Sequence, residues 1–258
     1  MGLIINSYSF GGYTARTTAF LAATGISDAT IANALNTMDL SLIANSLDTK
    51  IQALYPYVGG TATTHKFNFM NPADSDAAYR IVWAGGVTHN SNGVTGNGTN
   101  GIGDTKWGLN AGNRYDRSWS CYLRTSSSEN KWSGYYDGSR AFGIQLNSSV
   151  SPKKIVAQGL NNLSGISVTY DYGFLAASIP SSAANAAFYF NLSSVVYNTT
   201  AGSSPSSTNM PTLAMPSIGQ YTTRNLAFEH YGLGLTSAEL LTLSGIVTTF
   251  ETALGRNV

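Results

Sequence analysis

Charged residues are scarce in this sequence. Asp, Glu, Lys and Arg make up 10% of the 258 residues, against roughly 25% in ordinary soluble domains. The formal net charge is +1, and the basic residues are scattered along the chain, so no basic surface that would gather phosphates is expected. The composition therefore argues against a nucleic-acid partner, and solubility must come from hydroxyl and amide groups.

Cysteine and long apolar runs are also lacking. Cys121 is the single cysteine, which excludes an intrachain disulfide framework. It lies in the alternating run Trp119 to Leu123, a pattern that predicts a buried structural thiol. The N-terminus has neither the basic leader nor the apolar run of a signal peptide, and no segment approaches transmembrane length. We therefore expect neither export by a signal peptide nor a membrane span.

The N-terminal part of the sequence divides into an arm and a helical segment. Residues 1–12 alternate apolar groups before a glycine pair, which fits either an arm that adds a strand to a neighbouring copy or a first strand of the same domain. Residues 13–60 are expected to form a helical appendage. Helices are predicted over 14–24, from Ser27 or Asp28 to about residue 42, and over 47–55.

From residue 61 the apolar period changes to two, which is typical of antiparallel strands with one buried face. The predicted strands include His65-Phe67-Phe69, Tyr79-Ile81-Trp83, Phe142-Ile144-Leu146, Ile166-Val168-Tyr170, Phe188-Phe190-Leu192 and Arg224 to His230. Long Gly, Asn, Ser and Thr connections separate them. Many short strands without alternating helices predict a mainly β fold, an antiparallel sandwich of jelly-roll type over residues 61–258.

A helix is clearly marked near the C-terminus of the sequence. Thr236 and Glu239 form a capping box, and Gly255 stands where a left-handed C-cap is expected. Five apolar residues then fall on one face: Leu243, Ile246, Val247, Phe250 and Leu254. Such a face predicts a helix docked on the sandwich.

Several segments together resemble a known group of proteins. They are 55–67, 71–74, 76–80, 100–105, the turn 228–239 and the helix end 250–256, and they look like laminin-G or concanavalin-like sandwich modules of bacteriophage virion proteins from marine and metagenomic sources. The resemblance implies a non-enzymatic virion structural protein, a capsid decoration, tail or fibre component located in the virion. Its expected partners are other copies of itself and other virion proteins.

An enzyme is the third alternative, because concanavalin-like folds also house glycoside hydrolases. These need two carboxylates that flank the scissile bond, and the sequence has no Glu-x-Asp-x-Glu pattern of that kind. Glu129 and Asp137 could face each other around Trp132 and Tyr135, but acids in such loops are more often solvated surface groups. The three histidines show no metal-ligand spacing, and no Gly-x-Ser-x-Gly elbow marks a nucleophile. We therefore expect no catalytic residues.

Glycan binding has more support from the residue types, and a secreted or surface lectin is the second alternative. Sugars stack on aromatic rings and bond to amide or carboxylate groups. The candidates are Trp107, Trp132, Tyr135, Tyr136 and Asp137. The competing interpretation is that Trp107 and Tyr135 are packing residues of the core.

A calcium ion at the rim of the sandwich is the one cofactor to consider. Hard oxygen ligands in one loop would be supplied by Asn97, Asn100 and Asp104. The competing interpretation is a turn held by hydrogen bonds of the Asn and Asp side chains.

Overall fold

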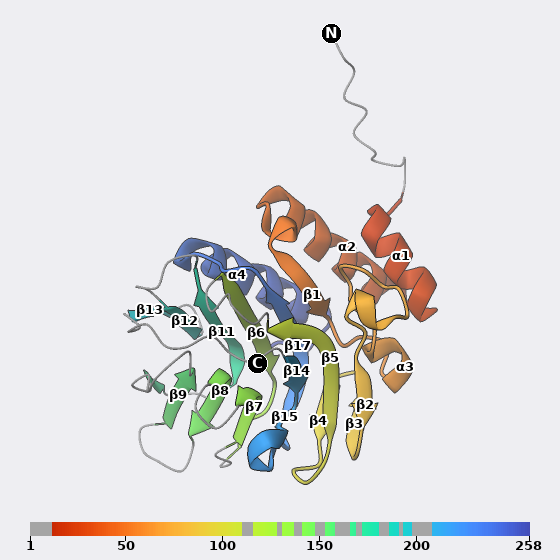
Figure 1. Cartoon of the computed structure of the whole chain (residues 1–258). Helices are drawn as coiled ribbons and strands as arrows, with labels where there is room; N and C mark the ends of the chain where they lie inside the picture. The colour runs from red at the N-terminus through yellow and green to blue at the C-terminus, as the bar shows by residue number, and fades with distance from the viewer. Residues whose placement is uncertain are drawn as a thin grey trace.

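The computed structural model of the chain describes the backbone of residues 12–109, 116–127, 131–136, 141–147, 153–157, 166–168, 172–180, 186–190, 193–197 and 208–258. Side chains are described for residues 12–108, 116–127, 172–180 and 209–258. The described parts form three layers (Figure 1): a layer of helices, a large antiparallel sheet, and a second layer of strands.

The large sheet has the strand order β13-β12-β11-β6-β17-β4-β3, and β1 also pairs with β17. Its strands are β1 (Ile51–Tyr55), β3 (Val87–Asn90), β4 (Gly93–Gly96), β6 (Arg117–Leu123), β11 (Gly173–Ile179), β12 (Ala186–Phe190), β13 (Ser193–Tyr197) and β17 (Asn225–Gly232). Every pairing between them is antiparallel. The central strands β6, β11 and β17 are buried along their whole length, because both faces of the sheet are covered.

The second layer consists of smaller antiparallel sheets. One has the order β14-β5-β2, one the order β10-β9-β8-β7, and β15 pairs with β16. The bounds are β2 (Val82–Ala84), β5 (Ile102–Leu109), β7 (Lys131–Tyr136), β8 (Ala141–Asn147), β9 (Lys153–Ala157), β10 (Ile166–Val168), β14 (Thr208–Thr212), β15 (Ala214–Met215) and β16 (Gln220–Tyr221). Trp107 of β5 stacks on Tyr231 of β17 with ring centroids 5.2 Å apart, so β5 packs directly on the large sheet.

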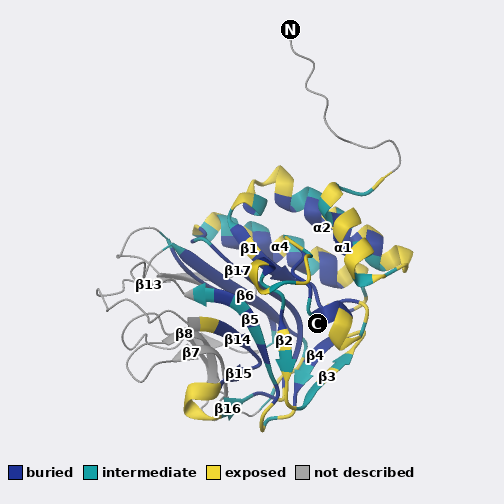
Figure 2. Cartoon of the chain, turned by 45° about the vertical axis from the view of Figure 1, so that its right-hand side comes forward, coloured by how far each residue is buried: buried dark blue, intermediate teal, exposed yellow. Residues whose placement is uncertain are grey.

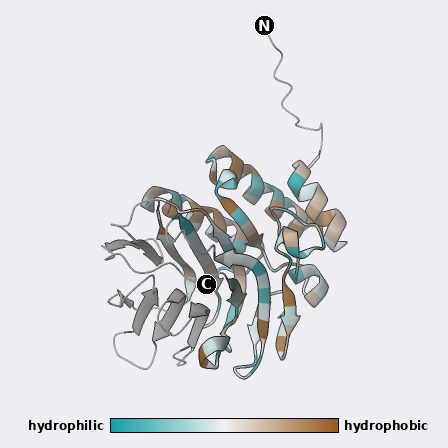
Figure 3. Cartoon of the chain, viewed as in Figure 1, coloured by the Kyte–Doolittle hydropathy of each residue, from teal (hydrophilic) through white to brown (hydrophobic). Residues whose placement is uncertain are grey.

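The described helices are α1 (Ala15–Thr24), α2 (Ala29–Ala44), α3 (Ala62–His65) and α4 (Ser237–Ala253), with 3-10 turns η1 (Leu47–Thr49), η2 (Asp76–Ala78) and η3 (Pro216–Ile218). Three of these four helices, α1, α2 and α4, lie close to the positions that the sequence predicts. Asp28 caps α2 by accepting a hydrogen bond from the Ile31 amide, and Thr236 with Glu239 forms the expected capping box of α4. Apolar and hydrophilic stretches alternate along the helices in Figure 3, as expected for helices with one face against a sheet.

The large sheet separates two apolar cores. One, between the sheet and the second layer, contains Trp107, Trp119, Cys121 and Tyr231. The other lies under the helices and contains apolar residues of α2, α4 and the opposite sheet face. Figure 2 shows β1, β6 and β17 as buried strands beneath α4. The predictions of a mainly β sandwich, a docked C-terminal helix and a buried Cys121 are confirmed.

Several local predictions are wrong. The third helix predicted over 47–55 is η1 followed by β1, because residues 51–55 pair with β17 and all of them except Gln52 are buried. The strand predicted over 65–69 is instead the end of α3 and a turn that contains the isolated bridge Asn68 to Asn71. The predicted arm, except for residue 12, lies outside the described residues.

Candidate functional site

A cavity of about 630 Å³ opens where the α1–α2 connection, the loop before α3 and the C-terminal end of α4 meet. Pockets that hold small ligands typically range from about 300 to 1,000 Å³. We call it the rim cavity. It is lined by Thr24, Gly25, Ile26, Ser27, Asp28, Thr30, Ile31, Val58, Gly59, Gly60, Thr64, Ser91, Ala253, Leu254 and Arg256.

The lining combines short polar groups with aliphatic surface. Hydroxyl groups come from Thr24, Ser27, Thr30, Thr64 and Ser91, and apolar surface comes from Ile26, Ile31, Val58 and Leu254. Local structure fixes several of these groups. Asp28 is the N-cap of α2, and Thr24 Oγ1 donates to the carbonyl of Phe20 one turn earlier. Hydrogen-bonding groups therefore stand beside aliphatic patches at the same opening.

Arg256 contributes to the wall of the cavity but has no free donor. Its side chain is 3% exposed, with Nε 2.8 Å from Oε2 of Glu251 and Nη2 2.9 Å from Oε1. Nη1 donates to the carbonyl of Tyr57, and Nη2 also donates to the carbonyls of Pro56 and Ala227. The guanidinium is thus committed to the protein, which leaves Asp28 as the accessible charged group among the lining residues.

Two glycines let the loop before α3 close against the cavity. Gly59 and Gly60 have φ of 87° and 74°, a region that favours glycine. A Cβ on Gly59 would lie 2.9 Å from Cδ1 of Ile26 and 2.9 Å from Cβ of Thr64. A larger residue at Gly59 would therefore push the cavity walls apart.

Behind this loop lies a histidine pair. The amide of Gly60 donates to Nε2 of His65 at 3.2 Å, and Nδ1 of His65 lies 3.1 Å from Nδ1 of His89. The ring of Trp83 meets that of His89 edge-on, with centroids 4.8 Å apart. The pKa of His65 is lowered to about 3, first by burial and then by His89 and Arg256. Burial also lowers the pKa of His89, so both rings are neutral near pH 7.

A buried carboxylate lies deeper, in the core between the sheet layers. Glu229 of β17 is fully buried and accepts hydrogen bonds from Tyr57 Oη at 2.8 Å, Trp119 Nε1 at 3.0 Å and Tyr231 Oη at 2.6 Å. Burial raises its pKa, and the hydrogen bonds partly oppose that rise. No local sequence pattern marks this acid as a buried group. Because no solvent reaches it, Glu229 serves as a polar anchor of the core in this structure and cannot touch a ligand.

A serine–histidine cluster is buried in the same way. His230 Nε2 lies 3.0 Å from Ser118 Oγ, and Nδ1 contacts Ser120 Oγ. Ser118 Oγ donates to the carbonyl of Leu233, so it accepts from His230 Nε2–H, and Ser120 donates to Nδ1. All three residues have 0% exposure. The cluster therefore ties β6 to β17 and offers no accessible nucleophile.

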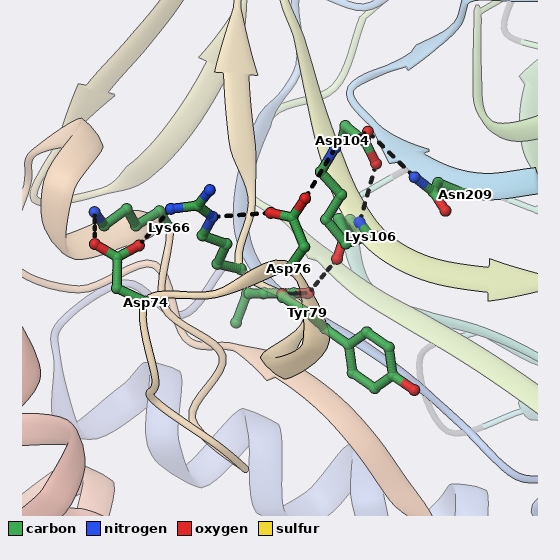
Figure 4. A network of polar contacts seen from close by, with 10 residues as sticks. Lys66, Asp74, Asp76, Tyr79, Asp104, Lys106 and Asn209 are labelled. Carbon is green, nitrogen blue, oxygen red and sulfur yellow. Dashed lines mark hydrogen bonds and ion pairs between the residues drawn. The ribbon is translucent and has the colours of Figure 1, made fainter.

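A ladder of opposite charges runs over the surface near η2 and β5 (Figure 4). Asp74 bonds to Lys66 and Arg80, Arg80 also bonds to Asp76, and Lys106 bonds to Asp104 at 2.8 Å. Asp104 Oδ2 additionally accepts from Asn209 at 3.3 Å. Each charge has a neighbour of opposite sign, so the ladder carries little net field.

The residues predicted to bind calcium have other partners in the structure. Asn97 Oδ1 accepts from the amides of Thr99, Asn100 and Gly101, and Asn97 Nδ2 donates to Asn100 Oδ1 at 2.8 Å. Asp104 belongs to the charge ladder. These bonds match the alternative of a turn held by Asn side chains, and the calcium site stays a prediction. In the described part of the chain no three His, Cys, Asp or Glu residues are grouped as metal ligands would be.

Of the residues predicted to bind glycan, the structure describes the side chain of Trp107. Trp107 is 5% exposed, and its Nε1 donates to Gln52 Oε1 at 2.8 Å, so it is a core residue as the competing interpretation held. Trp132, Tyr135 and Tyr136 lie on β7, and their side chains are outside the described set. Asp137 and Glu129 are also outside it. The rim cavity was not anticipated, because short hydroxyl residues in three separate segments carry no sequence signature.

Comparisons with known proteins relate the chain to others by fold alone. No family model and no curated protein matches it significantly. A Trypanosoma rangeli sialidase in complex with sialic acid superposes with a TM-score of 0.51 at 10% identity, over 74% of this chain and 32% of the sialidase. The matched region thus spans about a third of the sialidase. A Mycobacterium tuberculosis immunostimulatory antigen, described as a pseudo beta-1,3-glucanase, matches with a TM-score of 0.34 at 11% identity, over 58% of this chain and 78% of the antigen.

These matches correct the functional predictions. The sandwich part of the predicted resemblance is confirmed. The prediction of a non-enzymatic bacteriophage virion protein is contradicted, because the structure that superposes with a TM-score above 0.5 is a sialidase and does not relate the chain to a virion. The predicted virion location rested on that role. In the described residues no helix is both long and apolar enough to cross a membrane.

Proposed function

We propose that this protein binds a carbohydrate in the rim cavity. The observation that carries the proposal is the lining, in which five hydroxyl side chains and one carboxylate alternate with aliphatic surface around about 630 Å³. A sugar presents hydroxyls around its edge and C–H groups on its faces, so it can use both kinds of surface at once. The volume is large enough for one or two sugar rings.

The charge of the cavity favours a neutral sugar. Arg256 is held by Glu251 and by backbone carbonyls, so it is not free to pair with a carboxylate on a ligand. Asp28 would repel such a carboxylate and can accept hydrogen bonds from sugar hydroxyls. A neutral hexose or a short neutral oligosaccharide is therefore the ligand class that fits.

The structural comparison supports the carbohydrate class by analogy. The sialidase that shares the sandwich was solved with sialic acid bound. Since unrelated functions occur on one fold, this likeness adds weight to the class of ligand and assigns no residue. The preference for a neutral sugar over an acidic one comes from Asp28 and Arg256.

The proposal is tested on an array of neutral and sialylated glycans, followed by calorimetric titration of the glycan that binds best. We expect binding to neutral glycans and a loss of at least about tenfold in affinity for Ser27→Trp, which places a large ring in the lining. The matched control is Ser217→Trp, because Ser217 is also exposed but lies in η3, outside the cavity lining.

Two results would contradict the proposal. The first is that no glycan binds, and the second is that Ser27→Trp and Ser217→Trp bind as the unmodified protein does. After each titration the glycan is analysed for cleavage. Glu129 and Asp137, the two acids considered and set aside as a catalytic pair, lie outside the described residues, so turnover is measured directly.

A further inference from the structure

We infer that the sugar site continues from the rim cavity into a groove between α2 and α4, and that its ligand is a linear neutral oligosaccharide. This inference rests on the proposed function. The groove has a volume of about 580 Å³, and we call it the helix groove. Thr30 and Ala253 line both the helix groove and the rim cavity. The two hollows therefore meet at these residues, and a sugar chain that begins in one can continue into the other.

The helix groove follows α2 over most of its length. The helices α2 and α4 lie side by side in the helix layer (Figure 1). The lining includes Thr30 near the start of α2 and Ser41 near its end. At 1.5 Å per residue these two positions are about 16 Å apart along the helix axis. This shape suits an extended chain of sugar residues better than one compact ring.

The rims of the helix groove carry short polar groups, and its floor is apolar. The floor includes the buried residues Ala34, Met38 and Phe250. Among the described residues that line the groove, none is charged. A carboxylate or phosphate on a ligand would find no counter-ion there, which favours a neutral ligand. The exposed or half-buried rim residues are Asn33, Thr37 and Ser41 on α2 and Thr242, Gly245 and Thr249 on α4.

Three of the rim hydroxyls are fixed as hydrogen-bond acceptors. The hydroxyls of Ser41, Thr242 and Thr249 each donate to the backbone carbonyl four residues earlier in the same helix, at 2.8, 3.0 and 2.9 Å. Because each proton is used within the helix, the hydroxyl oxygen keeps a lone pair for a donor on a ligand. Sugar hydroxyls supply such donors. An acyl chain would instead cover these acceptors without bonding to them, which costs free energy.

Gly245 keeps the α4 side of the helix groove open. It is exposed, and a Cβ added to it meets no atom within 4 Å. Glycine is less favourable inside a helix than most other residues, so a larger side chain at this position should fill the groove without destabilising α4. A substitution of Gly245 therefore separates an effect on the ligand from an effect on the fold.

The inference is tested with the best linear neutral glycan of the array, titrated calorimetrically in a one-residue and a six-residue form. We expect the longer form to bind at least about tenfold more tightly than the shorter. Gly245→Trp should remove that gain and leave the affinity for the shorter form unchanged. Ser27→Trp should weaken binding of both forms, because Ser27 lines the rim cavity and not the helix groove.

The controls separate groove filling from damage to the helix. Thr252→Trp is the matched control, because Thr252 is exposed on α4 but lines neither hollow. It should bind both forms as the unmodified protein does. Thr37→Trp fills the groove from α2 and should act as Gly245→Trp does, so the test does not depend on one variant. Thermal unfolding followed by circular dichroism checks the fold of each variant.

The outcomes separate this inference from the proposed function. If the two forms bind equally and neither Gly245→Trp nor Thr37→Trp affects them, the extension is wrong and the cavity proposal stands. If the groove variants weaken the longer form while Ser27→Trp affects neither form, the cavity proposal is wrong and the groove remains a sugar site. If no glycan binds to the unmodified protein, both are wrong.

A second copy of the chain is the other occupant to test. Light scattering of the unmodified protein and of Gly245→Trp at equal concentration should give the same molecular mass. If the unmodified protein is a dimer and Gly245→Trp is a monomer with unchanged glycan binding, the groove is a contact between copies. That result would overturn the inference.

Discussion

Arg256 and Glu251 form a two-point ion pair that is almost completely buried, with the side chains 3% and 0% exposed. The pair joins the end of α4 to the backbone of residues 56 and 57 and to β17 through carbonyl acceptors. A buried charge needs such partners, because its desolvation is otherwise costly. The pair therefore fixes α4 against the sheet, and Arg256 contributes to the wall of the rim cavity.

Removal of one partner of this pair should be strongly destabilising. We expect Arg256→Met to lower the free energy of unfolding by about 3 to 5 kcal/mol, because Glu251 is left buried without its counter-ion. Urea denaturation followed by circular dichroism measures the change. Arg80→Met is the control, since Arg80 is 35% exposed in the surface ladder and should cost less than about 1 kcal/mol. Similar losses in the two variants would show that burial does not matter here.

The docking of α4 depends on its apolar face. Phe250 is 2% exposed in the core under the helices, so Phe250→Ala should cost about 3 to 5 kcal/mol in urea denaturation. Leu241→Ala, on the opposite face at 45% exposure, should change stability by less than about 0.5 kcal/mol. A Phe250→Ala loss below about half a kcal/mol would mean that α4 is not packed as the structure shows.

Stability should decrease as the pH falls below 6.5. The pKa of His230 is lowered by burial from 6.5 to about 3, so between these values the unfolded chain binds a proton that the folded chain does not. The folded state then loses up to about 1.4 kcal/mol per pH unit from this ring. His65, with a pKa also lowered to about 3, acts in the same direction.

The pKa shift of Glu229 has the opposite effect on the pH dependence of stability. Burial raises its pKa, so its contribution to stability is present at low pH and is lost as the pH rises through the folded value.

The histidine effect is isolated by comparing the unmodified protein with His230→Asn at pH 5 and pH 6. The slope of stability against pH should be smaller in the variant by about 1.4 kcal/mol per unit. Equal slopes would mean that His230 titrates in the folded protein.

Two glycines with positive φ should respond differently to alanine. Gly93 has φ of +115°, and a Cβ there would lie 2.2 Å from the carbonyl oxygen of Leu226. Gly93→Ala should therefore cost about 3 kcal/mol or more through strain in the β4–β17 contact. Gly219 has φ of +64° with nothing within 4 Å of the added Cβ, so Gly219→Ala should cost only about 1 kcal/mol. Thermal or urea unfolding of the pair gives the comparison, and equal costs would contradict the close approach at Gly93.

Asp28→Asn should change ligand preference without harming the fold. Asn caps a helix about as well as Asp, so stability should stay within about 0.5 kcal/mol of the unmodified protein. The affinity for sialylated glycans relative to neutral ones should rise several-fold, because repulsion of the ligand carboxylate is removed. Calorimetric titration with a matched glycan pair measures the ratio, and an unchanged ratio would show that Asp28 does not face the ligand.

The family resemblance served the fold better than the function. It implied a sandwich, and the comparison with the sialidase confirms that architecture. The virion role that it implied is contradicted, because sandwich modules share their alternating apolar pattern whatever they bind. Glu229 is a second feature that the sequence did not reveal. Its buried position on β17 is explained by the hydrogen bonds that it accepts from Tyr57, Trp119 and Tyr231.

The sequence by itself determined the features whose cause lies within a few residues. The caps at Thr14, Asp28 and Thr236 and the apolar face of α4 follow from contacts three or four residues apart. Only the tertiary structure decided that residues 51–55 form a strand, because β17, far along the chain, supplies their hydrogen bonds. The same holds for the site. His65 and His89 meet across 24 positions, and the rim cavity unites residues 24–31, 58–64, 91 and 253–256, a juxtaposition produced by packing the helices on the sheet and encoded in no local pattern.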